Sequence, residues 1–173
     1  MAESFDLYLG QTLDLPKRFS KGNTLTITSP TADISTVQNS RLLTEPKDAN
    51  PCDQTHFTLF NNAGDLMFRL HIRRQENGII INSRKKEGDW APFGPGSSRI
   101  DYPDIRRAFG PGYELRPTTI KLINNVSSID IFVNENFVGT YKMDIPGDAE
   151  KIEYEVLSGF PSVLHSDVQV TVE

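Results

Sequence analysis

The sequence predicts an all-β fold, a β-sandwich of two antiparallel sheets that is compatible with jelly-roll connectivity. Short segments rich in β-branched and aromatic residues recur along the 173 residues, as is typical of strands. Closely spaced turn sequences such as Glu76-Asn77-Gly78 separate most of them, which favours hairpins over crossover helices. No window shows a sustained helical apolar period. Because each sheet then has an apolar face to bury, the strands must pack sheet on sheet.

The strand pattern occurs in about ten segments, each bounded by turn residues. We predict strands at Phe5 to Leu9, Leu25 to Thr28, Phe57 to Asn61, Leu66 to Ile72, Ile79 to Ser83, Thr119 to Ile123, Ile129 to Val133, Phe137 to Lys142, Ile152 to Val156 and Val168 to Val172. One helical turn at most is expected between Asp101 and Phe109. The proline-containing stretches Ser29 to Thr55 and Ala91 to Pro117 are predicted as long loops.

Length and composition predict one globular domain over residues 1–173. The net charge of −5 gives no basic field for phosphate, so we expect no nucleic-acid partner. No apolar run approaches the roughly 20 residues that span a bilayer, so no membrane insertion is expected. Residues 1–10 lack a signal-peptide pattern, which predicts a protein that is cytoplasmic as synthesised. The single cysteine, Cys52, excludes an internal disulfide.

A polar face is predicted on two neighbouring strands. Strand alternation puts Arg69, His71 and Arg73 on one face, while the apolar residues between them turn to the other. The next segment follows after a turn and should pair antiparallel, which adds Asn82 and Arg84 on one of its faces. The only tryptophan, Trp90, follows one turn later.

This combination of side chains suits a sugar. A pyranose ring has hydroxyl groups that need hydrogen-bonding partners and a C–H face that stacks on an aromatic ring. Arginine, histidine and asparagine supply the first, and Trp90 supplies the second. The plainer interpretation is that Arg69 and Arg73 form a solvated strand face, that His71 is a surface histidine and that Trp90 belongs to the core.

The run from Leu70 to Trp90 resembles the sugar-binding signature of the galectins, especially those of mushrooms. The family pattern is His-x-Asn-x-Arg on one strand, an apolar residue-x-Asn on the next, and then Trp-x-x-Glu-x-Arg. Anchoring the pattern on Asn82 places Arg73, Asn82 and Trp90 at matching positions. The resemblance implies a galectin-like jelly-roll sandwich and a lectin, not an enzyme. Its concave sheet would bind carbohydrate through Arg69, His71, Arg73, Asn82 and Trp90.

The departures from the pattern imply an altered specificity. Arg69 stands where the family has histidine, and His71 where asparagine or a small residue is usual. In the family that histidine accepts a hydrogen bond from the axial hydroxyl of galactose, which an arginine, having donors only, cannot do. Phe93 and Pro95 replace the Glu and Arg after the tryptophan. The ligands expected are therefore β-galactoside-related or other glycans, with Arg99 or Glu87 as candidate replacements for the lost Glu.

The resemblance also has implications for assembly and location. Shallow, hydrated sites bind single sugars weakly, so avidity normally comes from several sites on one assembly. Relatives among the mushroom galectins imply a homodimer or homotetramer that recognises glycans or glycoconjugates. Export without a signal peptide is usual in the family, which would carry the protein to the extracellular space.

Two other functions are also compatible with the sequence. One is a galectin-shaped interaction module whose sugar site has decayed and whose arginines bind an acidic partner. The other is a glycoside hydrolase that uses Glu153 and Glu155, although these residues also fit a solvated strand edge. The histidines His56, His71 and His165 lie far apart in the sequence without acidic partners at metal-ligand spacing. No metal, cofactor or catalytic residue is therefore predicted.

Overall fold

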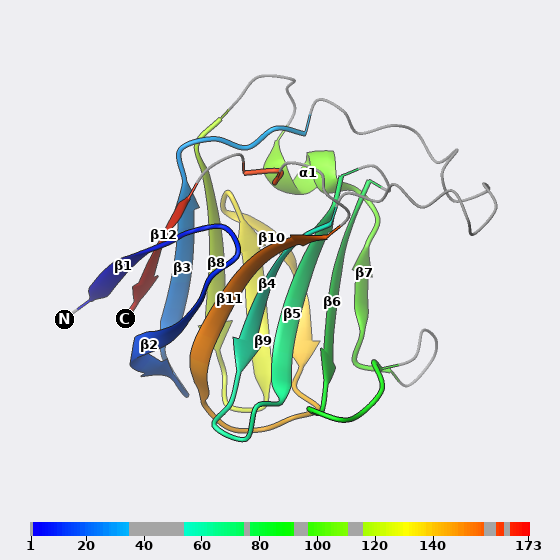
Figure 1. Ribbon diagram of the computed structural model, residues 1–173. Helices are drawn as coiled ribbons and strands as arrows, with labels where there is room; N and C mark the ends of the chain where they lie inside the picture. Colours follow the sequence, from blue (N-terminus) through cyan, green and yellow to red (C-terminus); the bar gives the residue numbers. More distant parts are fainter. Residues whose placement is uncertain are drawn as a thin grey trace.

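The computed structural model describes residues 2–34, 54–74, 77–91, 97–110, 116–157, 162–164 and 167–173. Figure 1 shows two layers of strands packed face to face. The strands are β1 (Glu3–Leu7), β2 (Thr12–Phe19), β3 (Thr24–Ser29), β4 (Gln54–Phe60), β5 (Leu66–Arg73), β6 (Gly78–Arg84), β7 (Ile100–Tyr102), β8 (Thr118–Asn124), β9 (Ser128–Val133), β10 (Asn136–Lys142), β11 (Ala149–Leu157) and β12 (Val168–Val172).

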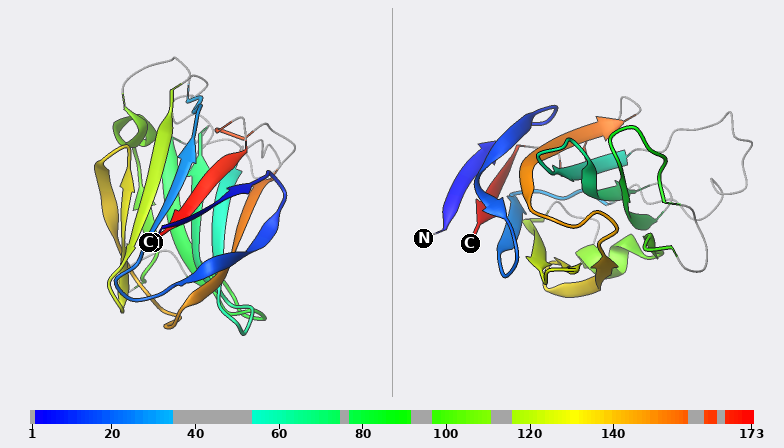
Figure 2. Two further views of the ribbon diagram at one scale, coloured as in Figure 1. Left: turned by 90° about the vertical axis from the view of Figure 1, so that its left-hand side faces the viewer. Right: turned by 90° about the horizontal axis from the view of Figure 1, so that it is seen from below.

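Both sheets of the described chain are antiparallel and six-stranded. The first has the order β1-β12-β3-β8-β9-β10, and the second has the order β2-β11-β4-β5-β6-β7. Strands distant in sequence are neighbours in both: β12 lies between β1 and β3, and β11 between β2 and β4. The two termini consequently lie near each other (Figure 2). The predicted all-β sandwich of two antiparallel sheets is confirmed.

The core lies between the two sheets and follows the period-two alternation of the strands. In β5, Phe68, Leu70 and Ile72 are fully buried, while Arg69 and Arg73 are only half-buried. The ring of Phe68 meets the ring of Tyr141 from β10 edge on, with the centroids 5.7 Å apart. The hydroxyl of Tyr141 donates to Ser83 Oγ at 2.6 Å, so this buried polar group is satisfied.

The predicted turns form as expected where the structure describes them. Asn134 and Glu135, between β9 and β10, both have positive φ, as a two-residue hairpin loop with the twist of its strands requires. Asn77, between β5 and β6, has φ 54°. Its side chain accepts a hydrogen bond from the Ile105 backbone and so ties this hairpin to the helix.

Two strands were not predicted from the sequence. β2 contains Pro16, Lys17 and Arg18, which look like a loop, but β2 is an edge strand, where a proline costs no ladder hydrogen bond. β7 has three residues and no run of apolar side chains, so its sequence gives no strand signal. It lies within the stretch Ala91 to Pro117, which was predicted as a loop. Of the other predicted loop, Ser29 to Thr55, residues 35–53 lie outside the described residues.

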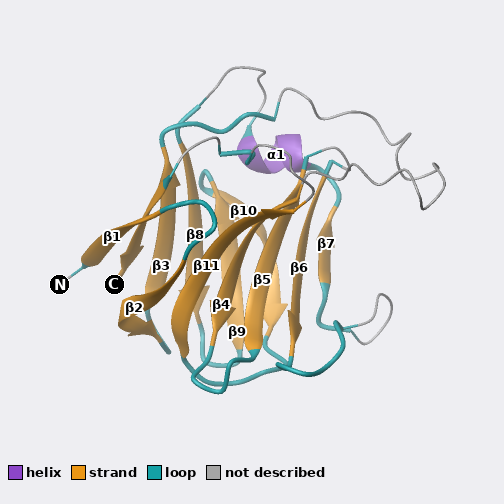
Figure 3. Ribbon diagram, viewed as in Figure 1, coloured by secondary structure: helices purple, strands orange, loops and turns teal. Residues whose placement is uncertain are grey.

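One short helix closes an end of the sandwich (Figure 3). Helix α1 (Ile105–Phe109) begins after Asp104, whose carboxylate accepts from the backbone N–H of Arg107, and it ends at Gly110 with φ 97°. This agrees with the single turn predicted between Asp101 and Phe109, although Asp101 itself belongs to β7. Among the described residues, no helix has the length and apolar character that a membrane crossing needs.

Replacing Phe68 by alanine tests the core. The side chain is fully buried against Tyr141, so its loss should lower the free energy of unfolding by roughly 3–5 kcal/mol in urea denaturation. Phe137→Ala is the matched control, because the side chain of Phe137 is 55% exposed and should contribute less than about 1 kcal/mol. Equal losses for the two variants would contradict this packing.

Candidate functional site

The outer face of the second sheet carries a cluster of polar side chains from four strands. The register aligns His56 of β4 with His71 of β5, and Thr58 with Arg69. On the two flanking strands, Glu155 and Glu153 of β11 face His56 and Thr58, and Asn82 of β6 faces Arg69. We call this set, together with Trp90, the polar face: His56, Thr58, Arg69, His71, Asn82, Trp90, Glu153 and Glu155.

Arg69 connects the strands of the polar face. Its Nε donates to Thr58 Oγ1 at 2.7 Å, and its Nη2 lies 3.3 Å from Glu153 Oε1. The second oxygen of Glu153 accepts from the hydroxyl of Thr12 at 3.3 Å. Burial, followed by the nearby Glu155 carboxylate, raises the pKa of Glu153, while Arg69 opposes this shift. The guanidinium group is thus held across β4, β5 and β11.

His71 is buried on this face, with only 7% of its surface exposed. Its ring lies edge on to the ring of His56, with the centroids 5.5 Å apart, and 5.9 Å from that of Trp90. Burial is the largest of the effects that together lower the pKa of His71 to about 2, and it is followed by His56 and by the guanidinium groups of Arg73, Arg69 and Arg99. The imidazole is therefore neutral at physiological pH. The alternative that His71 is a surface histidine is wrong.

Trp90 is half-buried and lies against two guanidinium groups. The Cζ atom of Arg69 is 5.1 Å from the centre of its ring, and that of Arg84 is 4.8 Å away. Both distances fall within the range of cation–π contacts. The predicted stacking residue therefore does meet Arg69 and His71, and Arg84 joins them. The alternation of Asn82 and Arg84 along β6 was the sequence signal for this third neighbour of Trp90.

Asn82 holds the chain segment that follows Trp90. Its side chain is buried, with 4% exposed. Its Nδ2 donates to the Ala91 carbonyl at 3.2 Å, and its Oδ1 accepts from the Ser83 backbone N–H at 2.8 Å. An amide nitrogen has two donors, so one N–H remains for a ligand. Asn82 therefore positions Trp90 in addition to any contact of its own.

The remaining predicted residues are placed less centrally. Arg73 is the last residue of β5 and pairs with Gly78. It is half-buried and lies on the same side of the strand as His71.

The two candidate replacements for the lost Glu are Arg99 and Glu87. Arg99 donates two hydrogen bonds to Asp101, at 3.2 and 3.0 Å, and Glu87 is exposed in a turn. Phe93 and Pro95 lie outside the described residues. In the described chain Arg69 is contacted by the carboxylate of Glu153, which comes from a different strand.

The interpretation of Glu153 and Glu155 as a solvated strand edge is wrong about the edge and about Glu153, although the Glu155 side chain is 42% exposed. β11 lies inside the sheet between β2 and β4, and the Glu153 side chain is only 16% exposed. The histidines lie far apart in the sequence, but the fold brings His56 next to His71 and to Glu155, whereas His165 lies outside the described residues. Sequence reasoning missed these groups because the pairing of β4 with β11 joins segments about a hundred residues apart.

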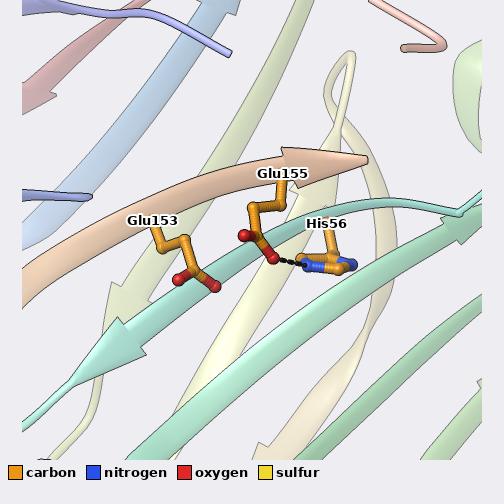
Figure 4. A group of neighbouring side chains, drawn as sticks. All are labelled: His56, Glu153 and Glu155. Carbon is orange, nitrogen blue, oxygen red and sulfur yellow. Dashed lines mark hydrogen bonds and ion pairs between the residues drawn. The ribbon is translucent and has the colours of Figure 1, made fainter. Parts of the chain in front are cut away.

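Figure 4 shows His56, Glu153 and Glu155 projecting from the same side of β4 and β11. His56 Nε2 lies 3.1 Å from Glu155 Oε2, and the His56 side chain is fully buried. Burial lowers the pKa of His56, as does Arg69, while the bond to Glu155 opposes the shift. The described chain thus gathers two carboxylates and one imidazole, and one of these carboxylates, that of Glu153, contacts Arg69.

The burial of His71 should make stability depend on pH. Between its folded pKa of about 2 and its unfolded value near 6.5, only the unfolded chain binds the proton, so stability falls as pH falls below about 6.5. Urea unfolding of His71→Asn from pH 7 to pH 4 should therefore show a shallower loss than the wild type, by at most about 1.4 kcal/mol per pH unit. Identical slopes would show that His71 is protonated in the folded state.

Comparisons with known proteins were made for the whole chain. No family model matches it. A fungal protein of Cyclocybe aegerita described as an anti-tumor lectin is 27% identical over 137 residues, which cover 78% of this chain and 81% of that protein.

Solved galectins share the fold along nearly the whole length. A galectin of Caenorhabditis elegans superposes with a TM-score of 0.64 at 17% identity, covering 98% of this chain and 95% of its own. Sheep galectin-11 gives 0.62 at 13% identity, with 96% and 99% covered. A tetrameric galectin from the ball sponge Cinachyrella sp. gives 0.57 at 14% identity, with 94% of each chain covered. The chain therefore has the galectin fold, and its sequence is similar to that of a fungal lectin.

Proposed function

We propose that the protein is a carbohydrate-binding lectin of the galectin type and that glycans bind on its polar face. The observation that carries this proposal is the position of Trp90, whose indole lies beside Arg69 and His71 on the outer face of a galectin-fold sheet. A half-buried aromatic ring surrounded by hydrogen-bonding side chains matches the two kinds of surface on a pyranose. The site binds a glycan and leaves its bonds intact.

The polar face offers both donors and acceptors to a sugar. Arg69 and the free N–H of Asn82 supply donors. Acceptors come from Glu153, which lies against Arg69, and from Glu155, whose side chain is 42% exposed. In the galectin pattern a histidine accepts from galactose at the position of Arg69 on β5, whereas here the acceptors lie two strands away, on β11. We infer from this displacement that the preferred glycan differs from an unmodified β-galactoside.

Stacking on Trp90 requires a rearrangement of its neighbours. Arg69 and Arg84 already lie over the indole, so a sugar ring that stacks there must share the face or displace a guanidinium group. A cation–π contact at a partly exposed site contributes about 0.5–1 kcal/mol, which is small enough for a sugar to replace. The displaced arginine can then donate to sugar hydroxyls or to an anionic substituent.

The assembly that we propose is a homodimer or a homotetramer. A single hydrated sugar site binds weakly, and several sites on one particle raise the avidity for a surface with many glycans. One of the solved structures of this fold is a tetrameric galectin. Sedimentation or light scattering of the purified protein should give two or four chains per particle, and a monomer at micromolar concentration would contradict the proposal.

A glycan array measures the function directly. The array should contain β-galactosides, GlcNAc oligomers, and sulfated and sialylated glycans, and it should be read at low and at high salt. We expect binding to a defined glycan that persists at high salt, because hydrogen bonds and stacking are screened far less than ion pairs. Binding to anionic glycans at low salt alone would favour the interaction module with a decayed sugar site. No binding to any glycan would contradict the lectin.

Replacing Trp90 by alanine should lower the affinity for the best glycan at least tenfold, because the stacking surface is lost. Trp90→Phe keeps an aromatic face and should retain part of the affinity, as measured by calorimetry. Phe137→Ala on the other sheet is the matched control and should bind as the wild type does. Unchanged affinity in Trp90→Ala would show that the glycan does not bind on the polar face.

A further inference from the structure

We propose that His56, Glu153 and Glu155 form a binding site for a divalent transition-metal ion at the β11 side of the polar face. The site shares Glu153 and Glu155 with the acceptors proposed for a sugar, but it does not depend on Trp90 or Asn82, because the three ligands belong to β4 and β11. Sugar binding by Trp90 and Asn82 could therefore be wrong while the metal site stands.

The strand register brings the three ligands together. Glu155 lies directly opposite His56 in the β11–β4 ladder, and Glu153 lies two residues earlier on the same side of β11. The potential ligand atoms all lie within 4.8 Å of one another, and His56 Nε2 and Glu155 Oε2 are 3.1 Å apart. Ligands of a tetrahedral zinc ion with bonds of about 2.1 Å are about 3.4 Å apart. The pair of His56 and Glu155 is already near this spacing, and Glu153 must move closer to complete the site.

The donor set selects the kind of ion. One imidazole nitrogen and two carboxylates suit Zn²⁺ and neighbouring first-row ions. Calcium and magnesium prefer oxygen ligands alone, so an imidazole disfavours them. The three side chains leave further coordination positions to water, which is the arrangement of an open rather than a closed metal site.

A buried imidazole distinguishes this group from an ordinary pair of surface acids. The His56 side chain is fully buried and its Nε2 points at the carboxylates (Figure 4). Packing against the ring of His71 fixes its orientation. Glu153 is mostly buried, whereas Glu155 is 42% exposed. One ligand is thus rigid and one faces solvent, so an ion can enter from the Glu155 side.

The charges of the ligands themselves favour a cation. Among the described residues, the guanidinium group that pairs with these two carboxylates is that of Arg69, which lies 3.3 Å from Glu153 Oε1. The next cation along β11 is Lys151, whose ammonium group lies 3.5 Å from Asp14 and is occupied there. The cluster thus holds more negative than positive charge before an ion binds. Arg69 competes for Glu153, so an ion that takes this carboxylate loosens the contact between the two side chains.

Zinc binding to the purified full chain tests the proposal without any sugar. The protein is first stripped with EDTA and dialysed, and Zn²⁺, Mg²⁺ and Ca²⁺ are then titrated separately by calorimetry, with the melting temperature recorded for each. We expect one Zn²⁺ per chain and a rise in melting temperature that the same concentration of Mg²⁺ or Ca²⁺ does not give. The absence of Zn²⁺ binding would overturn the proposal and would leave the lectin untouched.

Conservative variants locate the ion. Glu155→Gln and Glu153→Gln should each weaken Zn²⁺ binding at least tenfold, and circular dichroism should show that both remain folded. Glu150→Gln is the matched control, since Glu150 lies on the same strand but pairs with Arg18 at 3.0 Å, and it should bind as the wild type does. Wild-type Zn²⁺ affinity in both Glu155→Gln and Glu153→Gln would place the ion elsewhere and overturn the assignment.

Discussion

Apolar side chains that alternate along β4, β5 and β11 are buried in the core between the two sheets, and the rest of the structure depends on this constraint. Phe57, Leu70 and Tyr154 belong to the buried set, and Phe57 and Tyr154 stack with centroids 4.7 Å apart. A shift of register by one residue would expose this set and bury the charges between them. The apolar core therefore fixes which polar groups share the outer face, although it makes no contact with a ligand.

Arg69 links the polar groups of this face through direct contacts. It hydrogen-bonds Thr58, pairs with Glu153 and lies over Trp90, so it touches three elements of the sheet face at once. Burial of a guanidinium group is costly unless carboxylates and hydroxyls compensate it, and here they do. A ligand at Trp90 and an ion at Glu153 would both act on this one side chain. The two proposed sites are therefore expected to influence each other's affinity, and by linkage the effect must be mutual.

Much of the fold could be predicted from the sequence, because period-two alternation and short turn sequences are local signals. They placed Arg69, His71 and Arg73 on one face of β5, and the resemblance to galectins pointed to Trp90. Local signals do not reveal which distant strands pair. The neighbourhood of β11 and β4, and with it His56, Glu153 and Glu155, therefore needed the structure. β2 was missed for a related reason, since Pro16 is tolerated only because that strand lies at an edge.

Trp90 also offers the most direct measurement of the central claim, because it is the only tryptophan in the chain and all tryptophan fluorescence comes from the polar face. The bound glycan found by array should be titrated into the protein while this emission is recorded. A saturable change in intensity or wavelength, with the same midpoint as calorimetry, is the result predicted for a sugar that stacks on the indole. Glycan binding that leaves the emission unchanged would contradict the placement of the sugar on the polar face.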